Sequence, residues 1–199
     1  MHRPKQERSR KRQDHVLETA RSIIAEEGLD ALTMSVLSRR SGVAFGSLYQ
    51  YFPSRSAVLG KLAEIYFETL YGRYEVLTRD VSTPKAVAGA LSDTLRHFFG
   101  MVKKEKAFRD VWLAVQSDPV LRELEAKDNR RIVDLMVQAL VPHVTGFSAV
   151  RLQTACELIV ELAGGLVRHA VAKEENEQEQ LLEEFDIMAR AYFSLPEPV

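Results

Sequence analysis

The sequence predicts an all-α protein with a small N-terminal domain of three helices and a larger C-terminal helical domain. Apolar residues recur at spacings of three and four along nearly the whole chain, as in helices that bury one face. Two short segments of this kind, between residues 33 and 52, are separated by a tight turn that contains a glycine. The breaks between the longer segments carry residues that begin helices, such as Pro53 with Ser54 and Thr83 with Pro84.

The segment 33–52 predicts a helix-turn-helix. The Thr33 hydroxyl can accept a hydrogen bond from a free N–H group at the start of a helix over 34–41. Gly42 follows, where a left-handed residue that ends a helix is best made by glycine. A second helix is expected over 45–52. Such a pair is typical of DNA-binding units whose second helix enters the major groove, although an ordinary helical hairpin is the alternative.

The second of these helices has two different faces at about 100° per residue. Its apolar side consists of Leu48, Tyr51 and Phe52. Its polar side consists of Gly46, Ser47, Tyr49 and Gln50. Phe45 lies near the apolar side but in the first turn, where contacts with bases concentrate, so its role stays open. The polar side offers hydrogen-bonding groups, as a recognition helix requires.

Two runs of residues stand in fixed register around this segment. Residues 28–33 read Gly-Leu-Asp-Ala-Leu-Thr, and residues 42–55 read Gly-Val-Ala-Phe-Gly-Ser-Leu-Tyr-Gln-Tyr-Phe-Pro-Ser-Arg. Together they closely resemble the N-terminal domain of the TetR family of bacterial transcriptional repressors, over about 12–62. Three positions depart from the family's usual residues. Ala44 replaces a Ser or Thr cap, Phe45 replaces a polar or basic residue, and Ser35 replaces a longer side chain. The second helix is therefore expected to begin less firmly.

The resemblance and the two faces together predict which residues contact DNA. The predicted set is Thr33, Ser35, Phe45, Gly46, Ser47, Tyr49, Gln50 and Arg55. Within it, Tyr49 and Thr33 are expected to position the protein on phosphates, and Ser47 and Gln50 to lie closest to base edges. Phosphate contacts supply affinity, whereas base contacts supply sequence discrimination.

Charge is distributed unevenly along the 199 residues. Residues 1–60 hold ten basic against six acidic side chains, and the remainder holds 17 against 22, although the formal net charge is only −1. An excess of basic residues in the N-terminal part, beside an acidic remainder, indicates that the N-terminal part binds nucleic acid. Residues 1–12 are predicted to be a basic arm that contacts phosphates or the minor groove. A solvated tail is the alternative.

The rest of the chain predicts further helices. The first, at 13–27, supports the helix-turn-helix, which completes a DNA-binding domain at 13–54. A long helix at 55–77 then opens a domain at 55–199. The helices expected after it begin at Pro84, near Phe108, at Pro119 after an Asp118 cap, and after a Ser148 cap. The last expected helix has an apolar stripe from Leu181 to Tyr192, and the acidic stretch 174–179 before it is a connector or its first turn. Pro196 and Pro198 are expected to end the chain in a tail.

Several classes of chemistry have no support in the sequence. The single cysteine, Cys156, excludes an intrachain disulfide and a Cys-rich metal site. No phosphate-binding loop, nucleophile elbow or His-x-x-x-His pair is present, so neither an enzyme, a cofactor nor a metal site is predicted. An enzyme fused to a DNA-binding domain is a third alternative. No apolar span of about 20 residues occurs, which predicts a soluble cytoplasmic protein.

The resemblance implies a homodimer on a near-palindromic operator, released by a small apolar or amphipathic effector that moves the helix at 55–77. Candidate effector-binding residues are Phe67, Tyr71, Phe98, Trp112 and Met136. Candidate residues of the dimer interface are Leu158, Leu162, Gly165, Phe185, Met188 and Tyr192. The competing interpretation is a constitutive DNA-binding regulator with a filled core, controlled by a protein partner or not at all.

Overall fold

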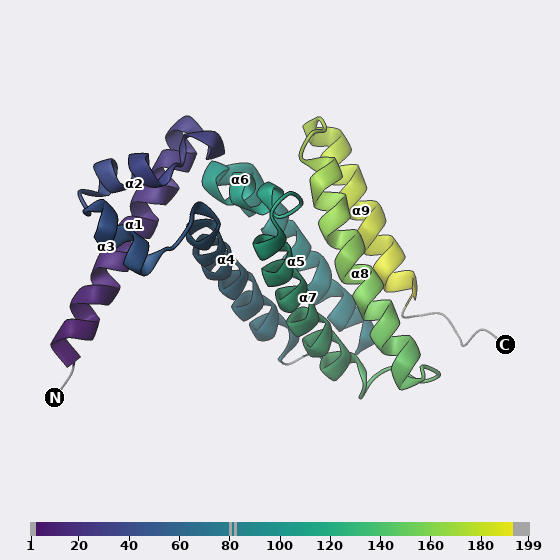
Figure 1. The fold of residues 1–199 in the computed structure, drawn as a ribbon. Coiled ribbons are helices and arrows are strands. Elements are labelled where there is room, and N and C mark those ends of the chain that lie inside the picture. Colours follow the sequence, from purple (N-terminus) through teal and green to yellow (C-terminus); the bar gives the residue numbers. More distant parts are fainter. Residues whose placement is uncertain (1–2, 80, 82, 193–199) are drawn as a thin grey trace. The chain divides into compact units, whose positions relative to one another are not determined.

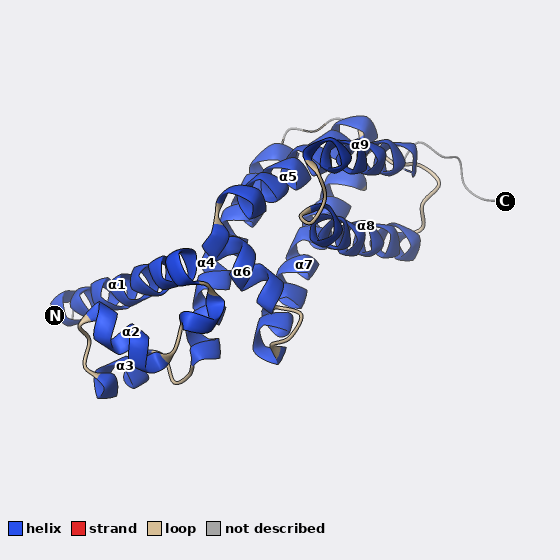
Figure 2. Ribbon diagram, turned by 90° about the horizontal axis from the view of Figure 1, so that it is seen from above, coloured by secondary structure: helices blue, strands red, loops and turns tan. Residues whose placement is uncertain are grey.

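The computed structural model describes residues 3–79, 81 and 83–192, and its described part is made of helices and loops (Figure 1). Within that part no strand is found (Figure 2). The helices are α1 (Arg3–Glu27), α2 (Met34–Ser41), α3 (Phe45–Tyr51), α4 (Arg55–Thr78), α5 (Pro84–Lys104), α6 (Lys106–Ala114), α7 (Pro119–Leu140), α8 (Ala149–Ala170) and α9 (Glu175–Tyr192), with a short 3-10 helix η1 (Leu29–Ala31) after α1. The all-α prediction is confirmed. The predicted tail with Pro196 and Pro198 lies outside the described residues.

The chain folds into two compact units. The first unit consists of Met1–Tyr66 together with Lys104–Leu124, and the second consists of Phe67–Lys103 together with Glu125–Val199. The first unit therefore contains α6 and the start of α7 in addition to α1, α2 and α3. A compact unit need not coincide with a functional domain, so the division of function at residue 54 stays a prediction.

Capping residues begin and end the helices where the sequence predicted them. The Thr33 side chain accepts from the Val36 N–H at 3.2 Å, and Ser54 accepts from Ala57 at 3.1 Å. Asp118 and Ser148 likewise accept from N–H groups of α7 and α8. Gly42 has φ 66°, the left-handed conformation that made glycine necessary at this turn. Ala44 provides no side-chain cap for α3, as its methyl group requires.

The first helix is longer than predicted. It begins at Arg3 rather than at about 13, so the basic segment continues α1 as a helix. Arginine, lysine, glutamine and glutamate favour the helix, and Glu7 pairs with Lys11 one turn later at 3.3 Å. The periodic apolar residues, on which the predicted start rested, begin only at Val16. Residues 7–12 of this charged segment are exposed or half-buried.

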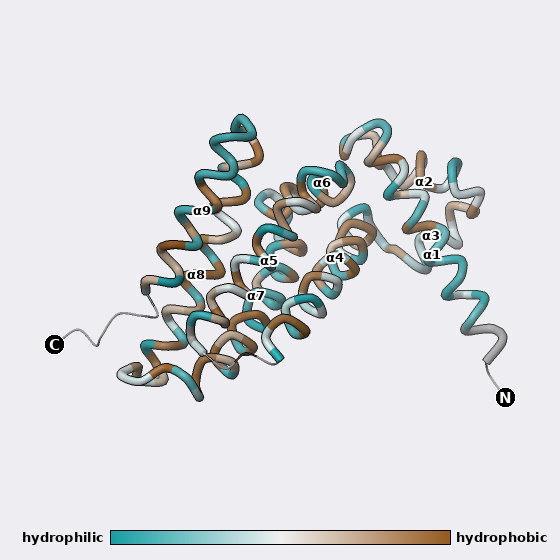
Figure 3. The backbone as a smooth tube through the Cα atoms, turned by 180° about the vertical axis from the view of Figure 1, so that it is seen from behind, coloured by the Kyte–Doolittle hydropathy of each residue, from teal (hydrophilic) through white to brown (hydrophobic). Residues whose placement is uncertain are grey.

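Each unit has its own apolar core. In the first unit the fully buried side chains include Val16, Ile23, Ile24, Leu32, Leu37 and Leu48. In the second they include Tyr74, Val87, Met136, Leu140, Cys156 and Val167. Hydrophobic and hydrophilic segments alternate along α8 and α9, as expected for amphipathic helices (Figure 3). These cores fix the helices whose exposed faces carry the candidate sites.

Candidate nucleic-acid interface

The α2–α3 turn is closed by its own side chains. Ser38 Oγ donates to the Val43 carbonyl at 2.7 Å, and Val43 is buried in the turn. Leu37 of α2 and Leu48 of α3 are both fully buried. The two helices of the predicted helix-turn-helix are therefore held in one relative orientation by packing and by hydrogen bonds.

The outer face of α3 is exposed as the sequence predicted. Gly46 and Gln50 are exposed and Ser47 is half-buried. Phe45, which the sequence left open, is 48% exposed, and its ring lies 4.7 Å from that of Tyr49, which is 41% exposed. Two adjacent aromatic rings thus stand on the polar face of α3 rather than in the core. Whether these residues contact DNA stays a prediction.

Three predicted contact residues lie outside α3. Thr33 and Ser35 are exposed at the start of α2. Arg55 is only half-buried, and its Nη2 donates to the Leu29 carbonyl at 2.8 Å. Because this bond fixes η1 to the start of α4, Arg55 has a structural role that the sequence analysis missed. A contact between Arg55 and DNA therefore competes with an existing hydrogen bond.

Two further side chains hold α2 against α1. The His15 Nε2 atom lies 3.0 Å from the carbonyl of Ser41 at the end of α2. Arg40 forms ion pairs with Glu26 at 2.7 Å and with Glu27 at 2.5 Å. The two carboxylates raise the pKa of the Arg40 guanidinium, and the largest cause is the hydrogen bond that Arg40 donates to Glu26. Sequence spacing alone gave no signal for these pairs, which join residues 13 to 26 positions apart.

The first unit also joins α6 to α1. Lys106 Nζ donates to the Ile24 carbonyl at 2.8 Å and pairs with Asp110 at 2.9 Å. Ser56 Oγ donates to Asp118 Oδ2 at 2.6 Å, and this hydrogen bond is the main cause that lowers the pKa of Asp118. A lysine at the C-terminal end of α1 also has a favourable position in the field of that helix. The segment 106–118 is thereby joined both to α1 and to the start of α4 within the first unit.

The predicted effector residues are divided between the two units. Phe67 and Met136 are buried in the second unit, where Phe98 is half-buried. Tyr71 lies beneath Arg131, whose guanidinium carbon is 3.9 Å from the ring centre. Trp112 is buried in the first unit. Their common role as a ligand wall stays a prediction.

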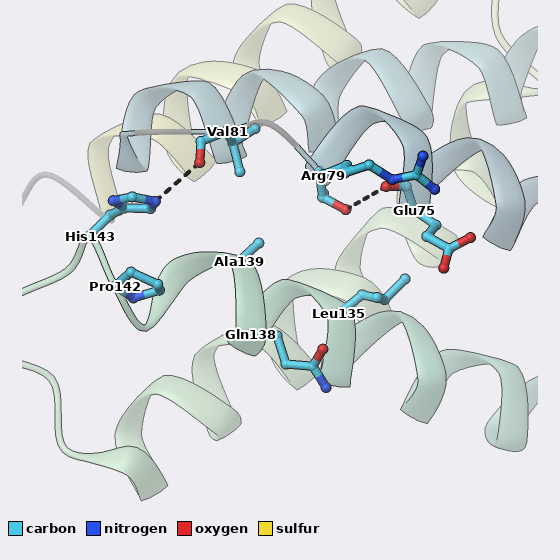
Figure 4. Close-up of a pocket in the computed structure, with 9 residues that line it drawn as sticks. Glu75, Arg79, Val81, Leu135, Gln138, Ala139, Pro142 and His143 are labelled. Atoms are coloured by element: carbon cyan, nitrogen blue, oxygen red, sulfur yellow. Dashed lines mark hydrogen bonds between the residues drawn. The ribbon is translucent and has the colours of Figure 1, made fainter.

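A cavity of about 370 Å³ lies in the second unit, between the ends of α4 and α7 (Figure 4). Its lining consists of Glu75, Thr78, Arg79, Val81, Leu135, Gln138, Ala139, Pro142 and His143, which include none of the predicted effector residues. The His143 Nε2 atom is 3.1 Å from the Val81 carbonyl, so the ring joins the turn after α7 to the segment after α4. The volume falls within the range of small-molecule sites, about 300–1,000 Å³.

The predicted dimer residues fall into two groups. Leu158, Leu162 and Met188 are 57%, 47% and 62% exposed, and Gly165 is exposed as well. Phe185 is buried within the protomer, and Tyr192 is half-buried with its ring 6.0 Å from that of Phe147. The residues of the first group expose apolar surface on α8 and α9, whereas the Phe185 side chain is packed in the core of the protomer.

The described residues contain neither a membrane-spanning helix nor a cluster of metal-binding side chains. None of the described helices is long and apolar enough to cross a membrane. No cluster of three or more His, Cys, Asp or Glu side chains suited to a metal ion occurs in the same part of the chain. Cys156 is buried, and desolvation raises the pKa of its thiol to about 12.

A three-helix unit with an exposed recognition helix, followed by helices α4 to α9, defines the class of helix-turn-helix transcription regulators. Comparison with known families agrees. Residues 16–62 match the profile of bacterial regulatory proteins of the tetR family, and residues 85–197 match the tetracyclin repressor-like C-terminal domain. The chain belongs to the TetR family of DNA-binding transcription regulators.

Curated relatives match only part of the chain. The transcriptional repressor KstR2 of Mycolicibacterium smegmatis is 30% identical over 73 residues, which cover 37% of this chain and 36% of the relative. The nucleoid occlusion factor SlmA of Actinobacillus pleuropneumoniae is 31% identical over 90 residues, 45% of each protein. The match therefore spans less than half the length of these relatives.

Solved structures share the fold over nearly the whole chain. A TetR-family regulator from Streptomyces coelicolor has a TM-score of 0.70 at 22% identity and covers 94% of this chain and 97% of its own. RolR in complex with resorcinol has a TM-score of 0.67 at 17% identity, covering 97% and 98%. The SmeT–triclosan complex has a TM-score of 0.68 at 18% identity, covering 95% and 99%. At these identities the likeness shows the fold alone.

Proposed function

We propose that this regulator is a cytoplasmic homodimeric repressor that leaves a near-palindromic operator when a small apolar or amphipathic effector binds. The observation that carries the DNA-binding half of the proposal is the exposed face of α3. Gly46, Tyr49 and Gln50 lie on that face, and α2 is fixed behind it by Leu37 and Leu48. A rigid helix with exposed hydrogen-bonding groups can enter a major groove without rearrangement.

Exposed apolar side chains on α8 and α9 support the dimer. Leu158, Leu162, Ile187 and Met188 are each between 47% and 62% exposed, and α8 packs against α9 within the protomer. Burying such a surface against a second copy would be favourable at about 25 cal/mol per Å². A two-fold dimer presents two recognition helices, so its operator would be nearly palindromic.

Two observations support a small-molecule effector. The second unit contains the cavity of about 370 Å³ at the ends of α4 and α7. RolR and SmeT, which share the fold, were solved with resorcinol and with triclosan, both compact aromatic compounds. We therefore propose an effector of similar size and polarity, bound either at the predicted aromatic wall or in this cavity.

The proposal is tested in two steps. Selection from a randomised DNA library should yield one near-palindromic sequence, which the protein binds as a dimer. A screen of small aromatic compounds should then find one that releases this DNA. Phe98→Ala abolishes release if the aromatic wall binds the effector, and His143→Ala abolishes it if the cavity does. Selection without a common sequence would contradict the DNA-binding proposal, and retained release in both variants would contradict both sites.

The constitutive alternative keeps one favourable observation. Phe67 and Met136 are almost completely buried within the protein, as expected for a filled core. Under this alternative, a compound screen finds no molecule that raises the melting temperature, since ligands that bind only the folded state stabilise it. The aromatic wall would then be core.

A further inference from the structure

A second, smaller cavity lies within the first unit, between α1 and α4. Its volume is about 140 Å³, and it is lined by Asp14, Leu17, Glu18, Arg21, Leu62, Ile65 and Tyr66. All of these residues belong to the first unit. The cavity is therefore separate from any effector site in the second unit.

The Tyr66 hydroxyl at this cavity has no hydrogen-bond partner among the described residues. Tyr66 is only 6% exposed, and its ring packs against Phe108 at a centroid distance of 4.7 Å. A buried hydroxyl without a partner is unfavourable by about 1–3 kcal/mol, so most such groups in folded proteins are paired. Because the ring is fixed by Phe108, the hydroxyl cannot easily turn toward another partner.

The cavity lining carries two carboxylates and one guanidinium. Asp14 and Glu18 line the cavity, and Arg21 compensates for one of them through a pair with Glu18 at 3.8 Å. Among the charges that act on the Tyr66 hydroxyl, that of Arg21 has the strongest effect, and the charges of Glu105 and Glu18 oppose it. Burial raises the pKa of Tyr66 to about 12, so the phenol stays neutral at pH 7 and its oxygen can accept a hydrogen bond.

The apolar walls and the volume limit the size of a ligand. Leu17 and Leu62 are buried side chains of the lining, and Ile65 adds apolar surface that is 47% exposed. At the ~30 Å³ that one water molecule takes in the liquid, the cavity holds roughly five heavy atoms. This volume suits a short alkyl chain with one charged end, and it is smaller than the sites of most drug-sized ligands.

We propose that the cavity between α1 and α4 binds a compact organic ammonium ion, whose N–H groups donate to the Tyr66 hydroxyl and to the carboxylates of Asp14 and Glu18. The alkyl part of the ion lies against Leu17, Leu62 and Ile65. The ion bridges the first helix and the long helix of the DNA-binding unit. This proposal does not depend on the repressor function, because it concerns binding to the free protein.

The test compares butylammonium chloride with 1-butanol, which has the same number of heavy atoms but no charge. Melting temperature and ¹H–¹⁵N spectra are measured for the full chain, with sodium chloride as the ionic-strength control. Butylammonium should raise the melting temperature in a saturable way and shift amide signals around 14–21 and 62–66, because it binds only the folded state. The alcohol and the salt should have little effect.

Tyr66→Phe is the decisive variant, since it removes only the hydroxyl and keeps the ring. We expect its affinity for butylammonium to fall about tenfold or more, in line with a lost hydrogen bond to a charged group. Its melting temperature without ligand should not fall, because an unpaired buried hydroxyl is removed. Glu18→Gln should also weaken binding. The matched controls are Tyr51→Phe and Glu123→Gln, which lie in the same unit away from the cavity.

Four results would overturn the proposal. Equal effects of 1-butanol would show that the cavity takes apolar groups without regard to charge. Equal effects of sodium chloride would show simple screening. An unchanged response of Tyr66→Phe and Glu18→Gln would place the binding elsewhere. A response that does not saturate would mean that the cavity holds only water.

Discussion

At the scale of single residues, the exposed face of α3 separates two kinds of contact. Tyr49 carries a hydroxyl suited to a phosphate, and Gln50 carries an amide that can make two hydrogen bonds to an adenine edge. Phe45 packs beside Tyr49 and restricts where its ring can lie. The two exposed side chains should therefore differ in how their loss changes DNA binding.

Tyr49→Phe should weaken binding to all sequences by a similar factor, because a phosphate contact carries no sequence information. Gln50→Ala should change which sequence is preferred, with about 1–3 kcal/mol lost at the base it reads. Binding to a randomised operator library measures both effects. Uniform losses of equal size in the two variants would refute the division between phosphate and base contacts.

A buried carboxylate in α7 makes stability depend on pH. Asp128 is almost fully buried, and one of its oxygens has no hydrogen-bond partner. Desolvation raises the pKa of Asp128 from 3.8 to about 6, against the opposing effect of Arg131 and with support from Glu68 and Glu125. The folded protein holds this proton more tightly than the unfolded chain does. Stability contributed by the protonated group is therefore lost as the pH rises through about 6.

Asp128→Asn should remove this dependence. Above pH 6 the variant should gain unfolding free energy, by at most about 3 kcal/mol for a shift of this size, and near pH 4 it should resemble the wild type. Denaturant unfolding at several pH values measures the difference. Asp134→Asn is the matched control, since Asp134 is exposed on the same helix. A gain that is equal at pH 4 and pH 8 would contradict the assignment to Asp128.

At the scale of elements, α1 has two chemically different halves. Its second half carries the buried Val16, Ala20 and Ile23, and its first half carries the basic residues of the predicted arm. A basic helix beside a helix-turn-helix can follow phosphates, although the contact itself is a prediction.

Deleting residues 1–10 should reduce the salt dependence of DNA binding. Each phosphate contact adds about −0.9 to the slope of log affinity against log salt concentration. Loss of three or four such contacts should flatten the slope by about 3. Fluorescence anisotropy at several salt concentrations measures this slope. If the slope does not change, the arm is a solvated extension of α1.

The element bounds that rest on capping residues could be predicted because their causes are local. Thr33, Gly42, Ser54 and Asp118 cap or end helices through atoms a few residues away. The faces of α3 also followed from periodicity, with Leu48 inside and Gln50 outside. The sequence could not reveal features that depend on distant partners.

Three features show this limit. Arg55 was predicted as a DNA contact, but its bond to the Leu29 carbonyl joins residues 26 positions apart. Lys106 donates a hydrogen bond to the Ile24 carbonyl, 82 positions away in the sequence. No local sequence pattern predicts this hydrogen bond. The unpaired hydroxyl of Tyr66 depends on the packing of two helices, whereas the sequence shows only one more aromatic residue in an apolar stripe.

At the scale of the whole molecule, the proposed dimer can be tested at a glycine. A Cβ atom added at Gly165 meets nothing within 4 Å in the protomer, and the same holds for Gly72 on α4. Gly165→Leu should therefore fold normally and separate the dimer if α8 forms the interface. Gly72→Leu is the control and should remain dimeric. Sedimentation of both variants measures this, and a wild-type monomer at micromolar concentration would refute the dimer altogether.

The last prediction concerns coupling between effector and DNA. An effector can change DNA binding only through different affinities for two conformations of the protein. The coupling must then be reciprocal, so operator DNA should weaken effector binding by the same factor by which the effector weakens DNA binding, typically about 5–150-fold. Calorimetry with and without operator measures one factor, and anisotropy with and without effector measures the other. Phe98→Ala or His143→Ala, whichever lies in the effector site, should abolish both factors and leave operator affinity nearly intact. Release of DNA by a compound that binds equally well with and without operator would contradict reciprocal coupling between the two sites.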